Sequence, residues 1–284
     1  MMDERFLIRS VRLVGALNLG PTPADVAGNL LMAERGIRTA KTLYPELRWL
    51  VLPELFTCGY SDLASAHRYA EDAHDGPSAR FFASLAADLG LYVVYGFPER
   101  VPGGVCDSAN LVGPGGVLLT YAKKHLVRET GEDMCFVPGD GPFVTEVDGL
   151  RVALAVCWDL GFPEFVREAA YGGAQLVLAP AGWRDPFGPQ YALACAARAL
   201  DNGVYVAGAN QLGDYPEARF TEAGGVYGPD GQRASRRVPE SALESALEIA
   251  ELDLSSPARW RARFGDTLGT PIVGRSSPSL EDIA

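Results

Sequence analysis

Short apolar runs alternate with amphipathic segments along most of this chain, and this alternation constrains the fold more than any other feature. Residues 21–25 open one helical segment, whose apolar positions recur every three or four residues: Val26, Leu30, Ala33, Ile37 and Ala40. Similar patterns predict helices at 77–89, 163–172 and 187–202. Apolar, β-branched runs predict strands at 10–18, 49–52, 91–97, 150–156, 175–179 and 204–209, with late strands at 226–227 and 246–252.

Two glycine–proline turns add hairpins to this alternation. Residues 113–116 (GPGG) separate predicted strands at 108–112 and 117–121, and residues 228–231 (GPDG) follow a third strand. Hairpins join antiparallel strands, whereas strand–helix–strand units join parallel ones. We therefore expect an α/β fold with a mixed sheet, or two stacked sheets, and helices outside.

The chain shows no internal repeat and no linker, so we expect one domain over residues 1–284. Residues from about 255 to 284 are rich in Arg, Ser and Pro and predict a C-terminal arm or tail. Residues 122–149 lack periodicity, and long irregular segments inside a domain are often functional.

Composition excludes several classes of function. The net charge is 25 − 36 = −11, which disfavours binding to nucleic acid or to an anionic membrane. The five cysteines form no Cys-x-x-Cys pair and there are only three histidines, so we expect neither a zinc site nor a disulfide framework. The chain shows no signal peptide and no apolar run that could span a bilayer. These features predict a cytoplasmic protein.

Cys157 is the first candidate for chemistry. The apolar run at 152–156 ends at this thiol, and a helix-compatible segment follows. A sharp strand-to-helix turn would expose the sulfur and aim the next backbone N–H groups at a developing oxyanion. The alternative is a small buried apolar residue, which is what most free cysteines are.

A thiol nucleophile needs a base and a cation or hydrogen-bond donors for the attacked carbonyl oxygen. Glu54 and Lys123 each follow a predicted strand, and Glu132 lies in the irregular segment after Lys123. Taken singly, each could be a solvated rim residue. Two of the three histidines lie in a polar segment, at 65–75, that predicts surface, and only His125 is near a candidate. A carboxylate–amine–thiol set is therefore better supplied than a histidine–thiol pair.

Several ordered blocks resemble the nitrilase superfamily of carbon–nitrogen hydrolases. The blocks span most of the chain and lie at 53–60 (PELFTCGY), 121–126 (YAKKHL), 132–139 (EDMCFVPG), 157–164 (CWDLGFPE) and 198–210. The resemblance implies a four-layer α-β-β-α sandwich with two mixed β-sheets, assembled as a homodimer or a higher homo-oligomer. It also implies hydrolysis of a non-peptide C–N bond with no cofactor and no metal.

The resemblance also implies catalytic roles. Glu54 would act as the general base, Cys157 as the nucleophile, and Lys123 with the N–H of Trp158 as the oxyanion site. Glu132 would orient Lys123 or the substrate. We expect neighbouring opposite charges to keep Glu54 and Lys123 ionised, and the ammonium to favour a Cys157 thiolate.

Tyr60, Trp158 and Trp183 are the expected substrate-binding residues, although ordinary packing is an equal alternative for Trp183. The chain departs from the family pattern in two places, since many members carry Arg where Gly161 stands and Gln where Asn18 stands.

The predicted function is hydrolysis of a small amide to a carboxylic acid and ammonia through a Cys thioester. Asp159 resembles the amidase-type members more than true nitrilases. The alternatives are a nitrilase acting on a small nitrile, an N-carbamoyl amidohydrolase, or a non-catalytic binding protein on the same fold. A glutaminase-type module is disfavoured because the chain shows no partner domain.

Overall fold

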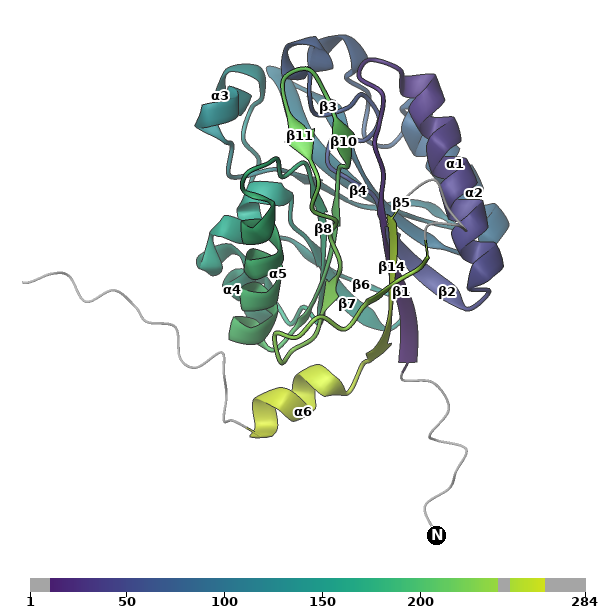
Figure 1. Cartoon of the computed structure of the whole chain (residues 1–284). Helices are drawn as coiled ribbons and strands as arrows, with labels where there is room; N and C mark the ends of the chain where they lie inside the picture. The colour runs from purple at the N-terminus through teal and green to yellow at the C-terminus, as the bar shows by residue number, and fades with distance from the viewer. Residues whose placement is uncertain (1–10, 240–245, 264–284) are drawn as a thin grey trace, which may run out of the picture.

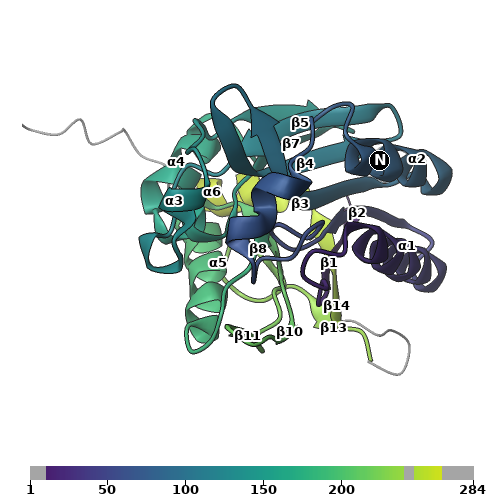
Figure 2. The same ribbon diagram turned by 90° about the horizontal axis from the view of Figure 1, so that it is seen from above.

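Two β-sheets pack face to face at the centre of the molecule, and helices cover both outer faces (Figure 1). The computed structural model describes residues 11–239 and 246–263. Figure 2 shows the layers from above, with α1 and α2 on one side and α4 and α5 on the other. This arrangement confirms the predicted four-layer α-β-β-α sandwich.

The first sheet has seven strands in the order β13-β14-β1-β2-β3-β4-β5. β2 runs parallel to both β1 and β3, and the other pairs are antiparallel. The strands are β1 (Val11–Asn18), β2 (Leu47–Val51), β3 (Tyr92–Val101), β4 (Gly104–Gly113), β5 (Gly116–Ala122), β13 (Arg236–Arg237) and β14 (Ala246–Asp253).

The second sheet has five strands in the order β12-β9-β8-β7-β6. Its three central strands are parallel, and both edge strands are antiparallel to their neighbours. The strands are β6 (Val144–Val147), β7 (Leu150–Leu154), β8 (Leu176–Ala181), β9 (Tyr205–Asn210) and β12 (Val226–Tyr227). A separate hairpin pairs β10 (Gly213–Asp214) with β11 (Arg219–Phe220).

The helices confirm most of the predicted segments. The α-helices are α1 (Val26–Leu43), α2 (Pro77–Leu89), α3 (Glu132–Cys135), α4 (Pro163–Tyr171), α5 (Gly188–Asn202) and α6 (Ser256–Arg263). Short 3₁₀ turns occur at η2 (Leu63–Tyr69), η3 (Arg128–Thr130) and η4 (Cys157–Gly161). No helix of the described ranges is both long and apolar enough to cross a bilayer. Residues 256–263 of the predicted arm form α6, and the rest of that arm lies outside the described residues.

Buried apolar side chains form one core between the sheets and another beneath α1 and α2. The core between the sheets joins Val14 and Val94 of the first sheet to Leu154 and Leu178 of the second. The predicted stripe of α1 reaches the outer core through Ala33, Ile37 and Ala40. Strand ends from both sheets are thereby fixed relative to one another, and the candidate residues follow those ends.

The segment 122–149 is more regular than the sequence pattern indicates, because it contains α3 and β6. β6 pairs with β7 through a tight turn in which Asp148 and Gly149 have φ of 53° and 72°. A two-residue hairpin needs positive φ at both positions, and Asp-Gly is a favoured pair for it. This Asp-Gly signal is present in the sequence and was missed.

Candidate active site

Glu54 follows β2 and is completely buried. Its backbone lies against Gly96 of β3, where an added Cβ would be 2.4 Å from the Leu55 nitrogen and 2.7 Å from the Glu54 Cα. Only glycine fits at such a contact, because a side chain would push the acid out of place. The close approach of the two strands therefore determines where the Glu54 carboxylate lies.

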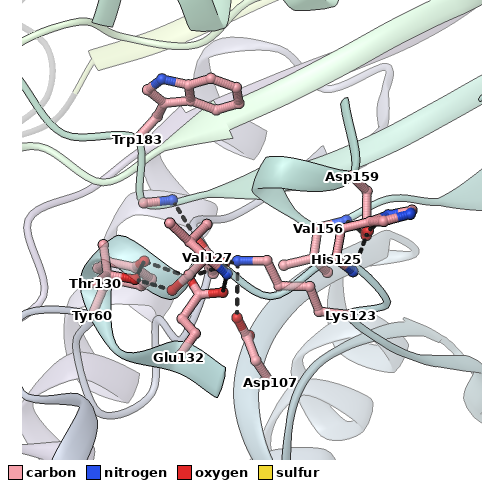
Figure 3. A network of polar contacts seen from close by, with 12 residues as sticks. Tyr60, Asp107, Lys123, His125, Val127, Thr130, Glu132, Val156, Asp159 and Trp183 are labelled. Carbon is pink, nitrogen blue, oxygen red and sulfur yellow. Dashed lines mark hydrogen bonds and ion pairs between the residues drawn. The ribbon is translucent and has the colours of Figure 1, made fainter. Parts of the chain in front are cut away.

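Lys123 lies among three buried carboxyl groups. Its Nζ is 2.6 Å from Glu54 Oε1, 2.8 Å from Glu132 Oε1 and 3.6 Å from Asp107 Oδ2. Figure 3 shows Glu132 and Asp107 next to the lysine. The carboxyl oxygens of these three acids lie within 4.8 Å of one another, a spacing that could hold a metal cation. The Lys123 ammonium occupies the position between them.

Opposite charges keep this lysine protonated. Burial alone lowers the pKa of Lys123. The negative charges of Glu54 and Glu132 raise it by more than burial lowers it, so the net pKa lies well above its ordinary value. Burial also raises the pKa of Glu132, although the Lys123 ammonium opposes that shift. The expectation of a charged Lys123 is confirmed.

Glu132 is fixed from three sides. Besides Lys123, it accepts hydrogen bonds from the Val127 N–H at 2.8 Å and from the Tyr60 hydroxyl. Figure 3 shows these groups converging on the carboxylate. Tyr60, which is expected to contact the substrate, thus also holds Glu132 in place. Glu132 belongs to an ion cluster that consists of Lys123, Glu54, Glu132 and Asp107.

Cys157 stands where the second sheet gives way to η4. β7 ends at Leu154, two residues before the predicted end of the strand, and η4 begins at Cys157 itself. The φ of Cys157 is 48°, in the left-handed region that side chains rarely adopt. This is the sharp turn expected of an exposed nucleophile, and it carries the thiol to the wall of a cavity.

The Lys123 ammonium favours the Cys157 thiolate, as expected, but two other effects outweigh it. Burial raises the pKa of the Cys157 thiol, and the Glu54 carboxylate raises it further. The Lys123 ammonium opposes both effects but does not cancel them, so the pKa stays well above its ordinary value. The resting thiol therefore keeps its proton, and attack on a substrate requires a base.

The cavity beside Cys157 has a volume of about 160 Å³ and is lined by all three expected substrate-binding residues, Tyr60, Trp158 and Trp183. Trp158 and Trp183 pack against each other, with ring centroids 5.3 Å apart. Sequence reasoning missed further lining residues, which include Val127, Phe187, Gln190, Glu129 and Arg184. Glu129 and Arg184 form an ion pair of 2.8 Å.

A sequence model of carbon–nitrogen hydrolases matches residues 13–262 of the chain. The chain belongs to the carbon–nitrogen hydrolase family.

Similar proteins span nearly the whole length of this carbon–nitrogen hydrolase. A protein of Pseudomonas protegens named "Hydrolase in pqqF 5'region" is 35% identical, over 85% of this chain and 83% of that protein. A protein of Pyrococcus abyssi named nitrilase is 31% identical, over 85% of this chain and 89% of its own length. A solved amidase variant from Nesterenkonia sp. AN1, with acrylamide added to its active-site cysteine, has a TM-score of 0.75 and 29% identity and covers 89% of this chain and 98% of its own.

Two groups of this hydrolase that touch the ion cluster were missed from the sequence. The Gly182 N–H, just after β8, donates to Glu54 Oε2 at 2.6 Å. Asp107, within β4, faces Lys123 and is completely buried. The segment 179–183 is expected to line the pocket and Gly182 does so, but nothing in the sequence marks its N–H as a donor to Glu54. Asp107 gives a weak signal, because it shares the β4 face of Ala109 and Leu111, where an apolar residue is the norm.

A second buried network joins the segments that carry Cys157 and Lys123. Asp159 of η4 accepts hydrogen bonds from the Val156 N–H and the Tyr121 hydroxyl, at 2.9 and 2.8 Å. It also accepts from the His125 backbone N–H at 3.1 Å, and its Oδ1 lies 2.8 Å from His125 Nδ1. These partners flank Cys157 on one segment and Lys123 on the other, so Asp159 ties the nucleophile turn to the lysine.

Proposed function

We propose that this hydrolase cleaves a small amide into a carboxylic acid and ammonia through a Cys157 thioester. The observation that carries the proposal is the buried Glu54–Lys123 ion pair, whose charges act directly on the thiol of Cys157 at the cavity wall. The Nesterenkonia relative, whose active-site cysteine reacts with acrylamide, supports a nucleophilic thiol.

The first step is attack on the amide. Glu54 takes the proton of the Cys157 thiol, and the sulfur forms a bond to the amide carbon while the carbonyl π electrons move to oxygen. Lys123 and the backbone N–H of Trp158 stabilise the resulting oxyanion. Because the resting thiol is protonated, proton transfer to Glu54 accompanies the attack.

The second step releases the amine. The oxyanion re-forms its carbonyl, the C–N bond breaks, and protonated Glu54 gives its proton to the departing ammonia. Water then attacks the thioester and passes a proton to Glu54, and that proton returns to sulfur as the acid leaves. Glu132 holds Lys123 in position throughout, which its hydrogen bonds to Val127 and Tyr60 support.

The cavity favours a small, uncharged acyl group. Trp158, Trp183 and Tyr60 bind it with mostly apolar surfaces. The cationic side chain of Arg184 lines the cavity but is already paired with Glu129. The positive charge of Arg184 is therefore partly neutralised and would attract a substrate carboxylate only weakly. A cavity of about 160 Å³ suits a short acyl chain.

Hydrolysis of a small nitrile is the second candidate, because the Pyrococcus relative is named nitrilase. The same thiol would attack the nitrile carbon and give a thioimidate in place of the tetrahedral amide adduct. Amide and nitrile substrates with the same acyl group separate the two proposals.

The test is ammonia release from matched amides and nitriles by purified protein. Cys157→Ala should abolish release, whereas the matched control Cys135→Ala should retain it, because Cys135 lies away from the cavity lining. Intact-protein mass spectrometry should detect the acyl adduct in the wild type and not in Cys157→Ala. Ammonia release by folded Cys157→Ala at the wild-type rate would overturn the proposal.

We further propose a homodimer or higher homo-oligomer in the cytoplasm. Leu193 and Leu200 of α5 are 68% and 44% exposed and lie two helical turns apart on one face of that helix. All five cysteines are free, which suits a reducing compartment. Light scattering on the purified protein and on Leu193→Glu measures the assembly directly.

A further inference from the structure

The ion cluster contains three carboxyl groups, and one lysine cannot neutralise the charge of all three. Glu54, Glu132 and Asp107 are all completely buried, and Lys123 is the cation among them. If all three acids were ionised, the four groups would sum to a charge of −2 away from water. Burying uncompensated charge is costly, and such a group usually neutralises instead.

Hydrogen-bond donors identify which acid is the neutral one. Glu54 accepts from Lys123 and from the Gly182 N–H. Glu132 accepts from Lys123 and from two further donors. Neither oxygen of Asp107 accepts a hydrogen bond from any group in the described part of the chain, and Lys123 Nζ lies 3.6 Å away. Two of the acids are thus built as carboxylates, and Asp107 is not.

The contact between Asp107 and Glu54 points the same way. Their carboxyl oxygens lie within 4.8 Å of one another, with no other hydrogen-bond partner described for Asp107. Two ionised carboxylates have no hydrogen to share, so these neighbouring groups can form a hydrogen bond only if one acid is protonated. Glu54 already accepts from two donors, which leaves Asp107 as the proton donor.

We propose that Asp107 is held as a neutral carboxylic acid that donates a hydrogen bond to Glu54 and acts as a positioning residue for the catalytic base. Its influence on the reaction rests on the proposed function, but its protonation does not. The bound proton reduces the charge of the cluster to −1. It also restrains Glu54 opposite the thiol while leaving Glu54 free to accept a proton.

The electrostatics around Asp107 support this assignment. Burial raises the pKa of Asp107, the negative charge of Glu54 raises it further, and Lys123 opposes both without cancelling them. Glu132 adds a smaller shift in the same direction.

Two thiols also face Asp107, and neither is a cation. Burial raises the pKa of Cys58 to about 12 and that of Cys106 to about 11, so both thiols are neutral at physiological pH. Lys123 remains the one positive charge described beside Asp107.

The first test uses Asp107→Asn and Asp107→Ala in amide hydrolysis. Asparagine keeps the shape and a donor but cannot ionise, so Asp107→Asn should hold kcat/KM at neutral pH within about tenfold of the wild type. It should also remove the alkaline fall in activity that follows loss of the Asp107 proton. Asp107→Ala should lose more than about tenfold in kcat. A loss beyond tenfold in Asp107→Asn, or an unchanged alkaline limb, would overturn the proposal.

The second test needs no substrate. Infrared spectra of the wild type at neutral pH should contain the carbonyl band of a protonated carboxylic acid, and Asp107→Asn should lack it. Asp159→Asn is the matched control. Asp159 is equally buried but accepts hydrogen bonds from several donors, so its replacement should leave the band in place. A wild-type spectrum without the band would refute the neutral acid. A wild type that shows the band but hydrolyses no amide would refute only the proposed function.

Discussion

Asp159 and Asp107 are two completely buried aspartates of the same site, but their surroundings differ. The carboxylate of Asp159 is matched by donors from Val156, Tyr121 and His125. The carboxyl group of Asp107 receives no donor from the described residues. Burial is the same in both places, so the number of donors determines what each side chain can do.

The comparison assigns the two acids different tasks. Asp159 serves as a structural tie, because its donors come from the segments that carry Cys157 and Lys123. Asp107, as we propose, remains protonated beside Glu54. Replacing the two acids should therefore affect different properties: the stability of the fold for Asp159, and the pH dependence for Asp107.

Replacing Asp159 should have the largest effect on stability. Asp159→Ala leaves the Val156 and His125 N–H groups and the Tyr121 hydroxyl without their acceptor. We expect a loss of about 3–5 kcal/mol in the free energy of unfolding, measured with urea, together with loss of ammonia release. A change below about 1 kcal/mol would contradict the structural role of Asp159.

The pH dependence of stability tests the other acid. The native pKa of Asp107 is raised, so between the ordinary carboxyl pKa and the native pKa the folded state holds a proton that the unfolded chain has released. The wild-type unfolding free energy should therefore fall as pH rises through this window, by up to about 1.4 kcal/mol per pH unit. Asp107→Asn should lack this contribution, so its stability relative to the wild type should increase with pH. If the unfolding free energies of the wild type and Asp107→Asn changed with pH in parallel, the proposed protonation of Asp107 would be contradicted.

His125 should give the smallest effect of the three. His125→Ala removes one donor to Asp159 and a ring stacked on Phe162 at 3.8 Å. We expect a loss of about 1–2 kcal/mol in the unfolding free energy. His74→Ala, on the surface, is the control and should change it by less than about 0.5 kcal/mol. In the Asp159→Ala background, His125→Ala should have a smaller effect than it has alone.

Much of the fold and part of the site follow from local sequence patterns. The strand–helix alternation and the two Gly-Pro turns predict mixed sheets between helices, and the order of the motif blocks singles out Glu54, Lys123 and Cys157. The structure brings Glu54, Lys123 and Cys157 together, as that pattern leads one to expect. Each follows the end of a strand, which is a pattern that its own segment shows in the sequence.

The protonation pattern could not be predicted in this way. Whether Asp107 or Glu132 keeps its charge depends on donors such as Val127 and Tyr60, which other segments bring to the site. The raised pKa of Cys157 likewise results from burial that no single segment reveals. Such properties belong to the assembled site and not to any stretch of sequence.

The division of the site between the sheets has a mechanical consequence. Glu54 and Lys123 extend from one sheet and Cys157 from the other, so sliding of one sheet over the other would separate the proposed base Glu54 from the proposed nucleophile Cys157. Side chains such as Leu178, in the layer between the sheets, resist that shear although they line no part of the cavity. The core between the sheets, which includes Cys157 itself, therefore sets the alignment of Cys157 with Glu54 and Lys123.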